Sequence, residues 1–110
     1  MPSDATGPIE YLRMLSDRDR VRVRYSHRRG VPDEIMAQLE CWIDGRWRPV
    51  RRYDTHMGLH VHTAPWDAEL DRLVQIGDLD LKSALTLAIA DMRANWEAYR
   101  AACEAGRRSE

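Results

Sequence analysis

Hydrophobic and polar residues alternate along the first half of the chain, and apolar residues recur at three- and four-residue steps in its C-terminal part. Alternation places apolar side chains on one face of a β-strand, whereas the longer steps place them on one face of an α-helix. The pattern therefore predicts an α+β protein. We expect an antiparallel meander of four to five strands, with one long C-terminal helix packed on one face.

The turn between the two clearest strands can also be predicted. Asp44-Gly45 follows the alternating run 35–43, and this dipeptide favours a two-residue hairpin turn because it tolerates positive φ. Counting outward from that turn places Trp42 opposite Trp47 and Leu39 opposite Val50. Continued further, the same register assigns the next four side chains to two faces: Arg52 and Asp54 on the face of Leu39, Arg51 and Tyr53 on the other.

Three further elements follow from shorter patterns. Residues 59–63 alternate, so Leu59 and Val61 should point into the core and the two histidines between and after them should point out. A short fifth strand is expected around 73–76. Gly7-Pro8 could open a short N-terminal helix that continues to Leu15.

The long C-terminal helix should begin after Asp80, whose side chain can cap it, and end near Gly106. A chain of 110 residues suits one domain with one modest core. We therefore expect a single domain over 1–110, with loose tails at 1–7 and 107–110.

Charge and cysteine content exclude few functions. The net charge of −1 carries no overall signal for nucleic-acid binding. Cys41 and Cys103 lie far apart without a cysteine framework, which is typical of reduced thiols in the cytoplasm. Neither a secretory leader nor an apolar run long enough for a membrane span is present in the sequence, so we expect a cytoplasmic protein without a membrane partner.

The candidate chemistry is concentrated between positions 46 and 62, which contain three of the four histidines. His56, His60 and His62 could share a metal ion, although no fourth ligand is evident. Alternatively, His60 and His62 could divide general base and general acid work in a metal-independent ribonuclease, while Arg52 stabilises phosphate charge. A structural hydrogen-bond network among the same residues is an equally good explanation.

RNA contact without catalysis is a third possibility. Arginines alternate on the strand at 20–26 and recur at 48, 51 and 52, where they could bind phosphates while Trp47 stacks on a base. Alternating charge on a strand is more often a solvated face. No nucleophile elbow or glycine-rich phosphate loop is present in the sequence, so common hydrolases and nucleotide-binding enzymes are disfavoured.

The order of these residues resembles a known family. Arg52-Tyr53-Asp54, a glycine-containing gap, His60-Val61-His62 and then Leu73-Val74-Gln75-Ile76 before a long helix are similar to the TumE-like family of small bacterial toxin–antitoxin proteins. The segment 47–56, together with 95–100, looks even more like a related group of uncharacterised small bacterial domains.

The resemblance implies a compact toxin-like protein whose partner is a small helix-turn-helix antitoxin. Its matching positions make Tyr53, Asp54, His60 and His62, with Arg52, the candidate catalytic residues. Trp47, Arg48 and Arg51 are the candidate substrate-binding residues. We expect no cofactor, RNA as a possible substrate and a possible homodimer. The alternatives are a non-catalytic protein- or nucleic-acid-binding module and a histidine-based metal-binding protein.

Overall fold

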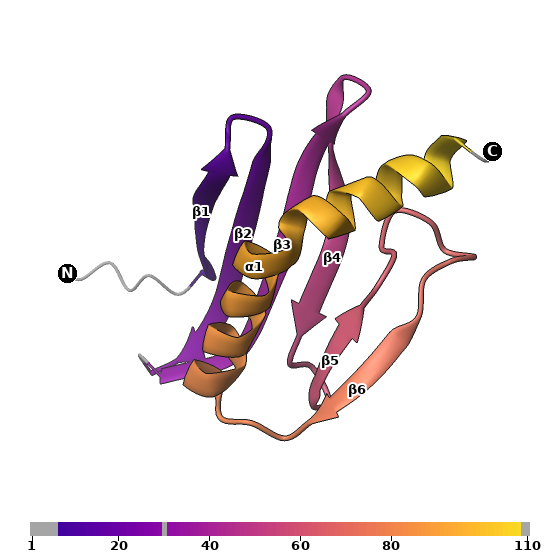
Figure 1. Ribbon diagram of the computed structural model, residues 1–110. Helices are drawn as coiled ribbons and strands as arrows, with labels where there is room; N and C mark the ends of the chain where they lie inside the picture. Colours follow the sequence, from indigo (N-terminus) through magenta and orange to yellow (C-terminus); the bar gives the residue numbers. More distant parts are fainter. Residues whose placement is uncertain (1–6, 30, 109–110) are drawn as a thin grey trace.

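The computed structural model describes residues 7–29 and 31–108. It contains a single six-stranded antiparallel sheet and one long helix (Figure 1). The elements in chain order are β1 (Ile9–Ser16), β2 (Asp19–Arg28), β3 (Val31–Ile43), β4 (Arg46–Asp54), β5 (Leu59–His62), β6 (Leu73–Gly77) and α1 (Leu81–Arg108).

The sheet is a meander, since each strand pairs with the strand that follows it, in the order β1-β2-β3-β4-β5-β6. The α+β class and the meander are confirmed, but the predicted count of four to five strands is wrong. The expected short N-terminal helix is also wrong, because Ile9–Ser16 forms the edge strand β1. An isolated helix of this length is marginal in water, whereas pairing with β2 gives the backbone of this segment hydrogen-bond partners in the neighbouring strand.

Helix α1 packs on one side of the sheet, which we call the helix face; the other side is the open face. Asp80 caps the helix as predicted: its Oδ1 accepts the backbone N–H of Ser83 at 2.8 Å. The helix contacts β2, β3 and β4, and Ala84 and Ala88 of the helix share the buried core with Leu59 and Val61 of β5, whereas β6 lies uncovered (Figure 1). It runs to Arg108, two residues beyond the predicted end. Of the predicted loose tails at 1–7 and 107–110, residues 1–6 and 109–110 lie outside the described residues, and residues 107 and 108 are the last two of α1.

The core lies between the helix and the central strands. Its fully buried side chains include Val21, Leu39 and Met92. Burial of one such side chain contributes roughly 1.5–3 kcal/mol. Within the described part of the chain, no helix is long and apolar enough to span a membrane.

A β-bulge in β4 changes the register that the hairpin turn predicted. Trp42 pairs with Trp47 as expected, but Leu39 pairs with Arg51 and not with Val50, which is the extra residue. Every later residue of β4 is therefore shifted by one position and changes face. Pro49, just before the bulge, pairs with Glu40 of β3, whereas β5 pairs only with residues 52–54 of β4; proline in a strand is tolerated at such local edges and at bulges.

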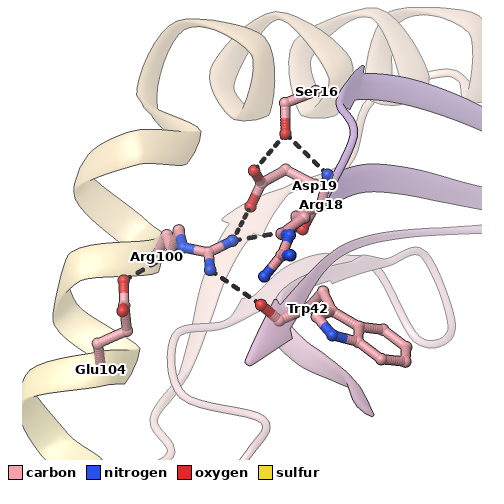
Figure 2. A network of polar contacts seen from close by, with 6 residues as sticks. All are labelled: Ser16, Arg18, Asp19, Trp42, Arg100 and Glu104. Carbon is pink, nitrogen blue, oxygen red and sulfur yellow. Dashed lines mark hydrogen bonds and ion pairs between the residues drawn. The ribbon is translucent and has the colours of Figure 1, made fainter. Parts of the chain in front are cut away.

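A partly buried ion pair connects the C-terminal half of α1 to the sheet (Figure 2). Arg100 Nη1 donates to Asp19 Oδ1 at 2.7 Å, and its Nη2 donates to the backbone carbonyl of Trp42 at 2.9 Å. Asp19 also accepts a hydrogen bond from Ser16. Burial would raise the pKa of Asp19, but Ser16, Cys41 and Arg100 together lower it below its ordinary value. One guanidinium thus joins the helix to two separate hairpins.

Candidate functional site

The bulge brings four of the five predicted catalytic residues onto the open face. Arg52 is the cross-strand partner of His62, and Asp54 is the cross-strand partner of His60. The expectation that Arg52 and Asp54 share the face of Leu39 is wrong, because the shift at Val50 reverses their orientation. The two histidines thus lie beside Arg52 and Asp54, not beside Arg51 and Tyr53.

His62 is held by a carboxylate that the sequence pattern did not indicate. Its Nδ1 lies 2.8 Å from Asp71 Oδ2, and each side chain is 23% exposed. Burial would raise the pKa of Asp71, but the Ala64 N–H, His62 and the nearby charge of Arg52 lower it below its ordinary value. An ionised carboxylate only accepts hydrogen bonds, so Nδ1 of His62 must carry the hydrogen. Nε2 is then the atom that can take or deliver a proton.

His60 occupies a more enclosed position than His62. Only 7% of the residue is exposed, and its Nδ1 lies 3.0 Å from the carbonyl oxygen of Gly58. A carbonyl only accepts, so this ring also donates through Nδ1. The two imidazoles meet edge to face, with ring centroids 5.1 Å apart. Two imidazoles in contact, one enclosed and one open, can divide proton donation and acceptance.

A chain of hydrogen bonds leads from Arg52 across the open face. Arg52 Nε donates to Gln38 Oε1 at 2.7 Å, and Gln38 donates to Glu40 at 2.8 Å. Glu40 also accepts from Arg20 at 2.8 Å and from Arg22 at 3.0 Å. Burial would raise the pKa of Glu40, but Arg22, Arg20 and Gln38 lower it below its ordinary value. Glu40 therefore compensates two of the arginines that the sequence suggested as phosphate ligands.

The predicted substrate-binding residues do not gather around the histidines. Trp47 lies on the open face, stacked under Arg20 with 3.8 Å between the guanidinium carbon and the ring centroid. Arg48 Nε donates to the carbonyl of Ile43 at 3.3 Å near the hairpin turn. Arg51 lies on the helix face, opposite Leu39.

Tyr53, the fifth predicted catalytic residue, also lies on the helix face. Its hydroxyl donates to Asp91 at 2.6 Å, and Tyr99 donates to the other oxygen of the same carboxylate at 2.6 Å. Arg51 Nε approaches Asp91 at 3.3 Å without the alignment of a hydrogen bond. Burial, with the adjacent Asp91, raises the pKa of Tyr53 to about 12. This arrangement links strand to helix and keeps Tyr53 away from the histidines.

The three histidines considered for a metal site do not come together. His56 is exposed at the β4–β5 turn, and its Nδ1 lies 3.2 Å from Glu34. In residues 7–29 and 31–108, no three His, Cys, Asp or Glu side chains form a group that could hold a metal ion.

A groove of about 290 Å³ extends the site along the open face. Arg24, Glu34 and Asp54 contribute its charged lining. Cys41 is not a candidate nucleophile, because burial raises the pKa of its thiol well above the ordinary value.

The fold and the site define a small α+β protein with a histidine pair, an arginine and two carboxylates on the exposed face of an antiparallel sheet. The chain matches the family described as "Domain of unknown function (DUF7718)" over residues 2–109, and it belongs to that family. No curated protein and no solved structure matches the chain significantly.

Proposed function

We propose that the open face is a metal-independent acid–base site acting on RNA, and that the protein is the toxin-like component of a bacterial toxin–antitoxin module. The observation that carries this proposal is the contact between His62 and Asp71 beside Arg52. A carboxylate-oriented imidazole next to a guanidinium provides a proton-transfer group and a positive charge at one place.

In the proposed reaction, Nε2 of His62 takes the proton of a ribose 2′-hydroxyl. The 2′-oxygen then attacks the adjacent phosphorus, and the bond from phosphorus to the 5′-oxygen breaks. The leaving oxygen receives a proton from His60 in its protonated form. The products are a 2′,3′-cyclic phosphate and a free 5′-hydroxyl, so the step needs neither metal nor redox partner.

Three other residues have supporting roles in this proposal. Arg52 stabilises the negative charge that develops on the phosphate, since its Nη groups form no hydrogen bond with the described residues. Asp71 keeps Nε2 of His62 free for the substrate. Asp54, at the border of the groove, orients the neighbouring nucleotide through Oδ2, because its Oδ1 accepts the backbone N–H of His56 at 2.7 Å and Oδ2 forms no hydrogen bond with the described residues.

The resemblance of 52–62 and 73–76 to the TumE-like family supports the toxin assignment. It also suggests a small helix-turn-helix protein as the neutralising partner. An adjacent gene for such a protein would be independent support.

The proposal is tested by expressing the chain with and without the adjacent gene and following growth and total RNA integrity. We expect growth arrest and RNA degradation with the wild-type chain, and loss of both with His62→Ala. His27→Ala is the matched control, since His27 is bonded to the carbonyl of Gly7 outside the site. Arrest that persists in a folded His60→Ala/His62→Ala double variant would refute a histidine-dependent reaction.

A second candidate function is a non-catalytic protein-binding module. The observation that favours it is the uncovered apolar surface of β6, where Leu73, Val74 and Ile76 are each at least 39% exposed. Growth arrest without RNA degradation, unchanged by His62→Ala, would support this function over catalysis.

A further inference from the structure

Strand β6 is an edge strand, and none of the residues that the structure describes pairs with its outer side. It pairs with β5 alone, and all five of its residues are exposed. Helix α1 passes over β2 to β4 and does not cover it (Figure 1). An uncovered edge presents unpaired backbone N–H and C=O groups and can accept another strand.

The composition of β6 suits pairing with another strand. Its sequence, Leu-Val-Gln-Ile-Gly, contains neither charge nor proline, and Leu73 and Val74 are 52% and 47% exposed. The opposite edge strand, β1, contains Glu10 and Arg13, and charged residues on an edge discourage association. The two edge strands therefore differ, and β6 is the better suited to pairing with a strand of another molecule.

The backbone phase of β6 identifies which groups face outward. The N–H of Thr63 donates to the carbonyl of Arg72 at 3.1 Å, and the same register pairs Val61 with Val74. In an antiparallel ladder the bonded pairs alternate, so Leu73 and Gln75 direct their N–H and C=O away from β5. These outward-facing backbone groups can form hydrogen bonds with a further strand.

An antiparallel copy of β6 would meet these groups in one particular register. Centred on Gln75, the pairing places Gln75 opposite Gln75 of the second copy and Val74 opposite Ile76. It also places Arg72 opposite Asp78 at both ends. Both of these residues are exposed, and neither has an ion-pair partner among the residues that the structure describes. The sequence of this edge is thus complementary to itself in charge and apolar contacts. Its backbone phase supports pairing at Gln75, and the register shift between Leu59 and His60 interrupts that phase before Gly77.

We propose that two copies of the chain form a symmetric dimer by pairing their β6 strands antiparallel about Gln75. The pairing makes one continuous sheet of two chains, closed by a two-fold axis. A five-residue strand is short against the roughly 1,200–2,000 Å² that a specific interface buries, so the dimer should dissociate in the micromolar range. The dimer does not depend on the proposed RNA chemistry.

The dimer would also bring the two histidine sites onto one face. Gln75 pairs with His60 across β5 and β6, so the two-fold axis relates one histidine pair to the other across both copies of β6. Three strand spacings separate the two β5 strands, or about 14 Å. One RNA strand could therefore contact both sites.

The test is the molar mass of the full chain in solution, measured by light scattering over a concentration series that reaches hundreds of micromolar. We expect about 12.8 kDa at low concentration and twice this value at high concentration. Gln75→Pro should abolish the dimer without unfolding the chain, because it removes an outward N–H. Gln75→Ala, which keeps that N–H, is its control.

A charge exchange tests the register itself. Arg72→Asp should weaken dimerisation by about tenfold, since it sets like charges opposite each other twice, and Arg72→Asp/Asp78→Arg should restore it. A wild-type chain that stays monomeric throughout, or a dimer that Gln75→Pro leaves intact, would overturn the proposal. Large open-ended oligomers would also contradict it, since they indicate pairing of β6 with β1. RNA cleavage by a monomeric Gln75→Pro variant would show that the proposed reaction does not require the dimer, so that the two proposals are tested separately.

Discussion

Arg52 lies directly across from His62 in neighbouring strands, on the side of the sheet that the helix does not cover. The extra residue Val50 in β4 sets the face on which Arg52 lies, because it pairs Arg52 with Gln38 and not with Ala37. Without that bulge, Arg52 would point toward the helix and Tyr53 would stand beside the histidines. The position of one extra residue thus determines which side chains form the candidate site.

Replacing Tyr53 tests this assignment. Tyr53→Phe removes one of the hydroxyl groups that bind Asp91 and should lower the free energy of unfolding by about 1 kcal/mol. It should leave RNA cleavage unchanged, because Tyr53 lies on the helix face. Denaturant unfolding and a cleavage assay of the same preparation check both expectations. Loss of cleavage with normal stability would place Tyr53 in the site after all.

Glu40 should be essential for stability. Glu40→Ala leaves Arg20 and Arg22 without their shared, largely buried carboxylate, and should destabilise the fold by about 2–4 kcal/mol. Glu10→Ala is the control, because Glu10 pairs with Arg22 at 3.2 Å but has a side chain that is 43% exposed. An exposed pair contributes at most about 1 kcal/mol. Equal losses of unfolding free energy in the two variants, measured by urea unfolding, would contradict the expectation that the buried carboxylate contributes more to stability than the exposed one.

Acid should weaken the attachment of the helix at Asp19. Because the pKa of Asp19 is lower in the folded chain than its ordinary value of 3.8, its contribution to stability is fully present above that value. The contribution is lost as pH falls through the folded-state pKa. Unfolding followed from pH 6 to pH 2 should therefore show a smaller acid-dependent loss in Asp19→Asn than in the wild type.

The partner of Asp19 offers a second test of the same contact. Arg100→Ala should cost about 2–4 kcal/mol, since it leaves Asp19 buried without its charge partner (Figure 2). Arg93→Ala, an exposed arginine on the same helix, should change stability by no more than about 0.5 kcal/mol. If Arg100→Ala proved equally mild, the contact would not hold the helix in solution.

Local sequence patterns predicted the elements better than their exact register. The Asp44-Gly45 turn, the Trp42–Trp47 pair and the Asp80 cap are confirmed because each depends on neighbouring residues only. The turn alone does not predict the bulge, and the one local signal beside it is Pro49, because proline in a strand lies at an edge or a bulge. Gly7-Pro8 and the apolar residues up to Leu15 are compatible with a short helix, and the pairing with β2 that makes this segment a strand is not visible in its local sequence.

The sequence predicts only those parts of the candidate site that depend on neighbouring residues. His60 and His62 belong to one strand, so their shared face followed from alternation alone. Asp71 reaches His62 through the loop between β5 and β6, and nothing in the spacing of nine residues indicates that contact. Asp91 binds Tyr53 and Tyr99, and this role depends on how the helix is rotated against the sheet, which the local sequence does not indicate.

The rate of RNA cleavage by the purified chain in the presence of a metal chelator tests the central claim most directly. We predict cleavage by the wild type and by His27→Ala, a loss of about 10²–10⁴-fold in His62→Ala and an intermediate loss in Asp71→Asn. The Asp71→Asn chain should remain folded, because the amide preserves the shape of the side chain. A folded wild-type chain that leaves RNA intact, or a His62→Ala chain that cleaves at the wild-type rate, would contradict the account.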